Sequence, residues 1–295
     1  MNDGFYRAFE ERYRGSRELI KSRLNAYLPF IEPLLAPHES AKAIDLGCGR
    51  GEWLELASEL GFNAVGVDLD DGMLAACLER KLNAQKADAL KTLRELSEES
   101  VALVSAFHVV EHMAFTDVRV LIREALRVLK PGGLLILETP NPENLVVGAS
   151  SFYTDPSHER PIPLELLGFA VEHAGFHRNK ILRLQETAEL HTTARIGLFS
   201  VLNGVSPDYG VVAQKNATVE VMCRFDEPFK ANYGISLALL AQRYDQQTEA
   251  RVRQVEEQVL AIFSSRSWRV TAPLRSVEKL AKLIKQRFQR SSPDE

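Results

Sequence analysis

Cysteine is scarce in this sequence, and long uncharged apolar runs are absent. The three cysteines, Cys48, Cys77 and Cys223, form no C-x-x-C pair, and this sparse, odd set fits a reducing compartment better than a disulfide framework. No apolar run approaches the roughly 18 residues that a membrane-spanning helix requires. The charged start, MNDGFYRAFEERYRG, lacks the apolar core of a secretory signal. We therefore expect a cytoplasmic protein, with membrane attachment only at its surface.

Net charge is low but unevenly distributed. The total of −4 argues against general binding of nucleic acid. Residues 264–290 contain eight Lys and Arg residues against one Glu, so this segment carries +7 and the rest of the chain −11. The asymmetry predicts a basic tail with an anionic partner. The tail could form a basic amphipathic helix that lies on an anionic membrane, on a partner protein or on its own domain, with its apolar face made of Val277, Leu280, Ala281, Ile284 and Phe288.

Strand and helix patterns alternate through the middle of the chain. The apolar runs AKAIDLG, NAVGVDLD, NAQKAD, VALVSAFHV and LLILETP are separated by helical patterns, and NKILRLQ and DYGVVAQK follow as two closing strands. Alternation of this kind predicts βαβ units, and fully apolar strands fit a parallel sheet covered on both faces. We predict an α/β fold over residues 37–227: a Rossmann-like, doubly wound sheet of seven mostly parallel strands.

Helical segments flank the predicted sheet. Residues 1–36 are expected to form an N-terminal helical lid, in which Ser16 could cap a helix. Residues 228–295 are expected to form a C-terminal helical extension. A heptad seam with one four-residue stutter predicts either a coiled coil between copies of the chain or a long helix packed on its own domain. The seam residues are Leu237, Ala241, Tyr244, Thr248, Val252, Val255, Val259 and Ile262.

The stretch IDLGCGRGEW carries the most specific chemical signal. Asp45 precedes Gly47, Gly49 and Gly51 between a strand and a helix, where glycines let a ligand approach the backbone closely. The spacing is not the G-x-G-x-x-G of dinucleotide enzymes. An acid before the first glycine would repel pyrophosphate but could hold an amino group. The expected ligand is therefore a nucleoside that bears an amino acid.

Two further acids end the next strands. Asp68 in VGVDLD could accept hydrogen bonds from both ribose hydroxyls, and Asp88 in KADAL could accept one from an adenine amino group. Any one of these acids alone is more often a loop or capping residue. Three acids at successive strand ends, on the edge where open α/β sheets bind ligands, favour a single cofactor site.

These motifs, with VSAFHVVEHM and LKPGGLLILETPNPEN, resemble class I S-adenosylmethionine-dependent methyltransferases over roughly residues 40–215. The resemblance implies S-adenosylmethionine as the cofactor. It also implies which residues bind the cofactor. Asp45, Gly47 and Gly49 would line the methionine part, Asp68 would bind the ribose, Asp88 and Ala89 would flank the adenine, Phe107 and His108 would lie beneath the cofactor, and Cys48, Gly51 and Leu69 complete the set.

A narrower resemblance rests on three short stretches. FYRAFEERYRGSRELI, TDPSHERPIP and SRSWRVTAPLR are similar to methyltransferases of bacterial surface-polysaccharide gene clusters. This implies O-methylation of a sugar or sugar-linked group in O-antigen or lipopolysaccharide biosynthesis, a lipid-linked glycan acceptor, a glycosyltransferase partner and a position at the inner membrane. The alternatives are a methyltransferase for a quinone or secondary metabolite, and a non-catalytic scaffold that recruits glycosyltransferases.

The stretch HVVEHM contains His108, Glu111 and His112. The pattern H-x-x-E-H resembles an inverted zinc motif, but that motif needs a helix, and this one begins at the end of a buried strand. It is also similar to the Glu-x-x-Glu-His pattern of quinone O-methyltransferases, with His108 in place of the first acid, which weakens a site for Mg²⁺. We therefore predict no metal, with His108 against the cofactor and the other two residues at the start of a helix that faces the cleft.

The proline-rich loop FYTDPSHERP follows the fifth strand on the cofactor edge of the sheet. His158 is the first candidate for a general base, with Asp155 orienting its ring, and His112 is the second. Alternatively, Asp155 caps a turn and His158 is a solvated surface residue. Candidate substrate-binding residues are Asn141, Tyr153 and Arg160, together with Arg14 and Arg17, which could instead form surface salt bridges.

Overall fold

The computed structural model describes residues 15–35, 41–278 and 282. The chain forms two compact units, Met1–Ala241 and Gln242–Glu295. The division falls after residue 241, whereas the predicted boundary lies between residues 227 and 228. Arg14 and most of the predicted amphipathic helix lie outside the described residues.

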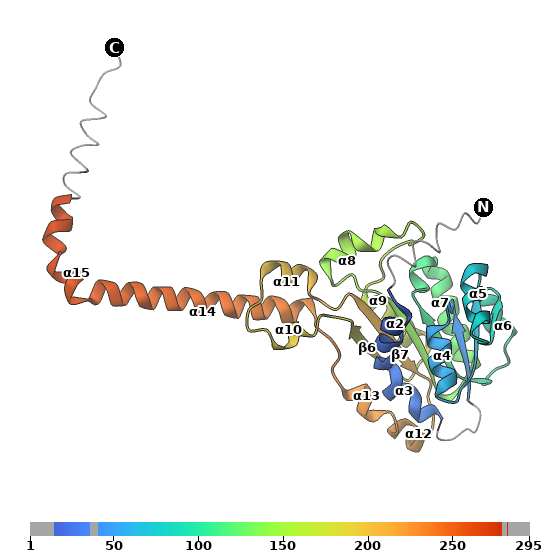
Figure 1. Cartoon of the computed structure of the whole chain (residues 1–295). Coiled ribbons are helices and arrows are strands. Elements are labelled where there is room, and N and C mark those ends of the chain that lie inside the picture. Colours follow the sequence, from blue (N-terminus) through green and yellow to red (C-terminus); the bar gives the residue numbers. More distant parts are fainter. Residues whose placement is uncertain (1–14, 36–40, 279–281, 283–295) are drawn as a thin grey trace, which may run out of the picture. The chain divides into compact units, whose positions relative to one another are not determined.

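Seven strands form one sheet in the order β3-β2-β1-β4-β5-β7-β6 (Figure 1). Strand β7 is antiparallel to both of its neighbours, and the pairs among β1 to β5 are parallel. The predicted seven-stranded, mostly parallel sheet is therefore confirmed. The strands are β1 (Lys42–Leu46), β2 (Asn63–Asp68), β3 (Ala84–Lys86), β4 (Val101–Phe107), β5 (Leu129–Pro140), β6 (Arg178–Leu184) and β7 (Asp208–Gln214).

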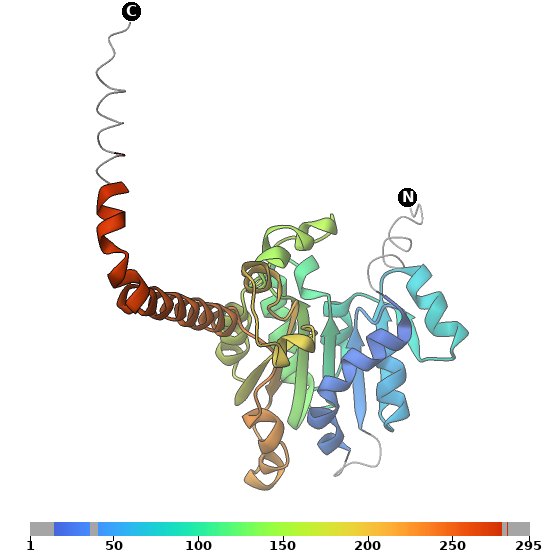
Figure 2. The same cartoon turned by 60° about the vertical axis from the view of Figure 1, so that its left-hand side comes forward.

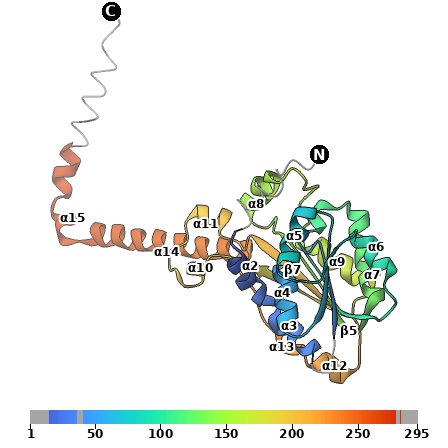
Figure 3. The ribbon, with the colours of Figure 1, turned by 45° about the vertical axis from the view of Figure 1, so that its right-hand side comes forward.

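Helices cover both faces of this sheet, as Figures 1 and 3 show. Alternate residues of β5 divide between two apolar clusters: Leu135 and Leu137 pack with α7 and α9, and Leu134 and Ile136 pack with the helices that precede β1 and with α4. Both faces are therefore buried, as the apolar strands predicted. The helices of the sheet unit include α4 (Glu52–Glu59), α5 (Asp71–Glu79), α6 (Ala89–Glu95), α7 (Phe115–Val128), α8 (Leu145–Ala149), α9 (Leu164–Ala174), α10 (Glu189–Thr192), α11 (Leu198–Asn203), α12 (Val219–Cys223) and α13 (Asp226–Lys230).

The segment before the sheet is built into the core. Helix α2 (Arg17–Leu24) begins at Ser16, whose side chain accepts a hydrogen bond from the Leu19 amide, so the predicted cap is present. Tyr27 and Phe30 are fully buried, and they pack against residues of the sheet and of α4. Three short helical turns complete the segment: η1 (Asn25–Tyr27), α3 (Leu28–Ile31) and η2 (Glu32–Leu34).

The long helix predicted near the C-terminus is present as α14 (Leu237–Ser264), and Figure 2 shows it unbroken. The predicted seam residues Val252, Val255, Val259 and Ile262 are 40–55% exposed. A short helix, α15 (Arg266–Val270), follows and is capped by Ser265. Among the described residues, no helix is both long enough and apolar enough to cross a membrane.

Candidate active site

A cavity of about 470 Å³ lies at the carboxyl ends of β1, β4 and β5. It brings together the glycine turn after β1, the end of β4 and the proline-rich loop after β5, as the sequence predicted. The predicted site residues that line it are Asp45, Gly47, Cys48, Phe107, His108, His112, Asp155 and His158.

The glycine turn needs its glycines for conformation and for space. Gly47, Gly49 and Gly51 have φ values of +65°, +53° and +80°, in the left-handed region that other residues rarely adopt. A Cβ atom on Gly47 would lie 2.4 Å from Cγ2 of Val109, and one on Gly51 would lie 2.6 Å from Cδ1 of Leu82. The turn therefore holds the backbone close to the cavity.

Two acids flank this turn. Asp45 is 4% exposed, and its Oδ1 accepts a hydrogen bond from the Ser105 hydroxyl at 2.8 Å. Asp68 accepts bonds from the backbone amides of Gly49, at 2.8 Å, and Asp70, at 2.9 Å. Each carboxylate oxygen has two lone pairs, so Asp68 can fix the turn and still accept from two ribose hydroxyls. These residues fit the predicted amino-acid and ribose contacts of S-adenosylmethionine.

The predicted adenine side lies on an open part of the surface. Asp68, Leu69, Asp88 and Ala89 are at the ends of β2 and β3 and do not line the cavity. Leu69 is 63% exposed. Asp88 caps α6 by accepting a hydrogen bond from the Lys91 amide at 2.8 Å, which is the capping role considered for it as an alternative.

His108 forms the centre of a half-buried ionic group, in which its own side chain is 33% exposed. Its φ of +55° is strained for a residue with a side chain. Nδ1 lies 3.1 Å from Glu111 and Nε2 lies 3.5 Å from Glu138. Burial disfavours the charged ring, but these two carboxylates raise the pKa of His108 well above its ordinary value. Burial likewise opposes the charge of Glu111, yet the hydrogen bond with His108 lowers the pKa of that carboxyl.

Asp208, on the strand beside that of Glu138, is a second acid in this group. Glu138 accepts hydrogen bonds from Tyr27 at 2.6 Å and from Gln185 at 3.2 Å. A carboxylate oxygen of Asp208, at the start of β7, lies within 4.8 Å of a ring nitrogen of His108 and of a carboxylate oxygen of Glu138. Burial, with a contribution from Glu138, raises the pKa of Asp208 to about 6.

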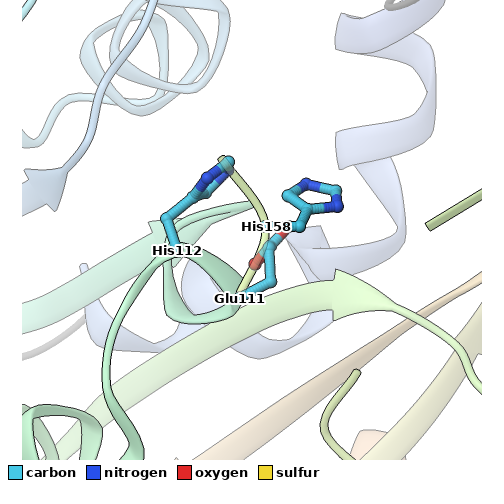
Figure 4. A group of neighbouring side chains, drawn as sticks. All are labelled: Glu111, His112 and His158. Carbon is cyan, nitrogen blue, oxygen red and sulfur yellow. The ribbon is translucent and has the colours of Figure 1, made fainter. Parts of the chain in front are cut away.

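The imidazole ring of His112 lies next to that of His158 in the proline-rich loop, with ring centroids 4.7 Å apart (Figure 4). Nδ1 of His158 lies 2.6 Å from the carbonyl oxygen of Phe152. A carbonyl only accepts, so Nδ1 carries the proton and Nε2 keeps the lone pair. Nε2 lies 3.9 Å from Asp155. The predicted orientation of the ring by Asp155 is therefore corrected, because the Phe152 carbonyl holds it.

The same logic applies to His112. The Ser157 hydroxyl donates to Asp155 at 2.6 Å and lies 3.0 Å from Nδ1 of His112. A hydroxyl has one proton, so it accepts from Nδ1–H of His112. Nε2 of His112 then keeps its lone pair. Asp155 therefore positions the imidazole ring of His112 through the Ser157 hydroxyl.

Of the predicted substrate-binding residues that the structure describes, none lines the cavity. Arg17 binds Glu55 at 2.7 Å and the Arg50 carbonyl at 2.8 Å, and so connects α2 to the glycine turn. Asn141 is fully buried and donates to the Ser206 carbonyl. Tyr153 is 59% exposed, and the Arg160 guanidinium lies over the Phe115 ring. The side chains of Arg17 and Asn141 are therefore engaged in contacts within the protein, whereas the roles of Tyr153 and Arg160 stay predictions.

Sequence reasoning missed other lining residues. Three of them have buried side-chain polar atoms that form no hydrogen bond among the described residues: Nε1 of Trp53, Oε1 of Gln185 and Oε1 of Glu52, of which the last forms ion pairs instead. Glu138 could have been found, because it is an acid within the otherwise apolar strand LLILETP. Glu52 and Trp53 directly follow the glycine turn, and Ser151 and Thr154 lie at the start of the proline-rich loop. The others come from segments distant in sequence. The missed residues are Ile20, Arg23, Leu24, Glu52, Trp53, Glu138, Ser151, Thr154, Gln185 and Asp208.

Known proteins are similar to this chain in sequence and fold. Residues 44–137 match a family model described as a methyltransferase domain. The crystal structure of a SAM dependent methyltransferase from Archaeoglobus fulgidus is 33% identical, covers 72% of this chain and 100% of its own, and has a TM-score of 0.64.

Two curated relatives match over shorter stretches. A ubiquinone biosynthesis O-methyltransferase from Bradyrhizobium sp. (strain ORS 278) is 37% identical over 106 residues, or 34% of this chain and 40% of the relative. A probable S-adenosylmethionine-dependent methyltransferase from Mycolicibacterium smegmatis is 29% identical over 133 residues, or 45% and 51%. The chain therefore spans about half the length, or less, of these curated relatives.

Proposed function

The chain belongs to the S-adenosylmethionine-dependent methyltransferases, and from this premise we propose that it methylates an oxygen atom of a hydroxylated acceptor. Membership confirms the predicted fold, enzyme class and cofactor. The acceptor and the roles of the individual residues are parts of the proposal.

Residues of the glycine turn and of the neighbouring strand ends would hold the cofactor. When bound, S-adenosylmethionine supplies a methyl group activated by a sulfonium. The glycine turn and Asp45 would bind its amino-acid part, and Asp68 would bind its ribose. Phe107 packs between Tyr27 and Trp53, with ring centroids 5.4 and 4.9 Å away, and forms the apolar wall beside the methyl-transfer region.

The observation that carries the proposal is the bond from Nδ1 of His158 to the Phe152 carbonyl, which makes Nε2 the proton acceptor of the neutral ring in a residue of the cavity wall. Methyl transfer to a hydroxyl needs a base for the hydroxyl proton, whereas transfer to a phosphate oxygen does not. His158 would accept this proton, and Asp155, 3.9 Å from Nε2, would stabilise the imidazolium that forms. His112 is the second candidate base, since its Nε2 is also unprotonated.

The polar floor of the cavity supports a sugar or sugar-linked acceptor. Glu138, Asp208 and the unpartnered Oε1 of Gln185 offer hydrogen-bond acceptors that an acceptor with several hydroxyls would satisfy. A quinone-type ring would leave more of these groups without partners. The similarity to ubiquinone biosynthesis O-methyltransferases supports the quinone alternative. A role in O-antigen or lipopolysaccharide biosynthesis, a lipid-linked glycan, a glycosyltransferase partner and contact with the inner membrane rest on the short motifs alone.

Calorimetric titration with S-adenosylmethionine and S-adenosylhomocysteine, followed by an acceptor screen, tests the proposal. We expect binding, and methyl transfer to sugars or sugar conjugates in preference to catechols. Transfer to catechols alone would favour the quinone alternative. Cofactor binding without any transfer would favour the scaffold alternative.

A further inference from the structure

We propose that Glu111, His112 and His158 form a binding site for a divalent transition-metal ion such as Zn²⁺. A carboxylate oxygen of Glu111 and a ring nitrogen of each histidine lie within 4.8 Å of one another. Figure 4 shows that Glu111 and His112 come from one short helical segment, η3 (Val110–His112), and that His158 comes from a separate loop. The sequence alone did not predict a metal, because only the fold brings His158 to the other two residues.

Hydrogen bonds orient the imidazole rings of His112 and His158 for metal binding. Nδ1 of each ring bonds to a protein oxygen, the Phe152 carbonyl for His158 and the Ser157 hydroxyl for His112. Metal-binding histidines commonly donate the other ring N–H to such a group, which fixes the tautomer and the ring orientation. Here this leaves Nε2 of each ring as the ligand atom.

The carboxylate is also fixed in place. Glu111 is 1% exposed, and its two oxygens accept hydrogen bonds from Nδ1 of His108 at 3.1 Å and from the Thr139 hydroxyl at 2.9 Å. Each oxygen keeps a second lone pair for an ion. The Glu159 amide donates to the Glu111 carbonyl at 2.8 Å, which ties the loop of His158 to η3.

The donor set selects the class of ion. Two imidazole nitrogens and one carboxylate suit Zn²⁺, Co²⁺ or Ni²⁺, whereas Mg²⁺ and Ca²⁺ prefer oxygen ligands. Ligands of a tetrahedral zinc ion at 2.0–2.1 Å are about 3.3 Å apart, so a set of atoms within 4.8 Å of one another could close onto an ion by small movements of the side chains. Because both histidines line the cavity, the remaining coordination position faces the acceptor.

The ion and the acceptor proton would compete for the same lone pair. This consequence, unlike the site itself, rests on the proposed function, in which Nε2 of His158 is the base. Loading with Zn²⁺ would then slow methyl transfer, and a chelator would restore it.

The site is tested by titrating the chelator-treated full chain with Co²⁺, followed by visible absorption, and with Zn²⁺, followed by calorimetry. We expect one ion per chain, at least tenfold weaker binding by both His112→Ala and His158→Ala, and no comparable binding of Mg²⁺. His191→Ala is the matched control, because His191 is 52% exposed at its side chain and pairs with Glu186 outside the cavity. Cys223→Ser tests whether the exposed thiol of Cys223 binds the added ion instead.

Absence of stoichiometric binding, or binding that survives loss of both histidines, would overturn the proposal. Glu111→Gln should weaken binding as well, and circular dichroism would show whether this variant folds. If Glu111→Gln does not fold, the two histidine variants still test the site. The titration contains no cofactor and no acceptor, so its failure is distinct from a failure of the proposed methyl transfer.

Discussion

Nδ1 of His158 and the carbonyl oxygen of Phe152 are 2.6 Å apart, so two residues of one short loop fix the tautomer of the neutral His158 ring. If Nε2 is the base, His158→Ala should lower kcat by about 10²- to 10⁴-fold, the usual contribution of general-base catalysis. The affinity for S-adenosylmethionine should not change. Steady-state kinetics across pH, with calorimetry of cofactor binding, would measure both. Unchanged kcat in the variant would exclude this role.

A second prediction concerns Asp68, which holds the amides of Gly49 and Asp70. Asp68→Ala should weaken S-adenosylhomocysteine binding at least tenfold, because it removes charged hydrogen bonds to ribose and loosens the glycine turn. Asp71→Ala is the matched control. Asp71 lies nearby at the start of α5, but its carboxylate pairs with Lys86 and is largely exposed. Equal losses in the two variants would contradict a specific ribose contact.

A substitution at Gly47 can separate the effect of a steric clash from the effect of backbone strain. Gly47→Ala combines a φ of +65° with a Cβ atom 2.4 Å from Val109, whereas Gly61→Ala has a φ of +103° and no atom within 4 Å. Both variants incur backbone strain, but only the first adds a clash beside the cavity. Thermal unfolding should show the larger loss for Gly47→Ala, and cofactor binding should fall in that variant only. A similar loss in both would mean that conformation alone matters.

Local patterns explain what the sequence could predict. Asp45 and Asp68 each follow an apolar run and precede a helix, so their strand-end positions follow from neighbouring residues. Gly47, Gly49 and Gly51 of the turn have positive φ values, as a tight turn predicted. Arg17 and Asn141 were also near the site in sequence, but backbone carbonyls engage both side chains, and no local pattern indicates such contacts.

Long-range pairing explains what the sequence could not predict. Asp208 comes close to Glu138 because β7 inserts antiparallel beside β5, with Pro140 opposite Asp208. The pairing joins segments far apart in the chain, and its register is set by the whole core rather than by either segment. The meeting of His158 with Glu111 and His112 depends in the same way on how the loop after β5 folds back over the end of β4.

A fourth prediction concerns the exposed seam of α14, for which we propose a second copy of the chain as the partner. In a parallel pair, Arg251 and Glu256 would occupy facing g and e positions with opposite charge. Replacing Val255 and Val259 with Ser should weaken self-association in sedimentation equilibrium. Leu260→Ser is the control, since Leu260 is 66% exposed but lies off the seam. A wild-type chain that stays monomeric at all concentrations would contradict the coiled coil.

The raised pKa of Asp208 predicts a pH-dependent stability. The folded-state value is about 6, above that of an unfolded aspartate, so the unfolded chain releases this proton first as pH rises. The stability due to protonated Asp208 is therefore complete below about pH 4 and is lost as pH passes 6. Asp208→Asn should raise the free energy of unfolding at pH 7.5 by about 1–2 kcal/mol, which allows for partial exposure of the side chain, and by less at pH 4.5.

Asp226→Asn should show the opposite sign in the same denaturant titrations. Hydrogen bonds from Arg178 and Lys230 lower the pKa of Asp226, so its contribution is present at neutral pH and is lost as pH falls. That variant should be less stable than wild type at pH 7.5 and should approach it in acid. If Asp208→Asn instead destabilises the protein at pH 7.5, the ionised carboxylate is held by His108 more strongly than burial opposes it. The ionic group around His108 would then be a balanced set of charges rather than one with an excess acid.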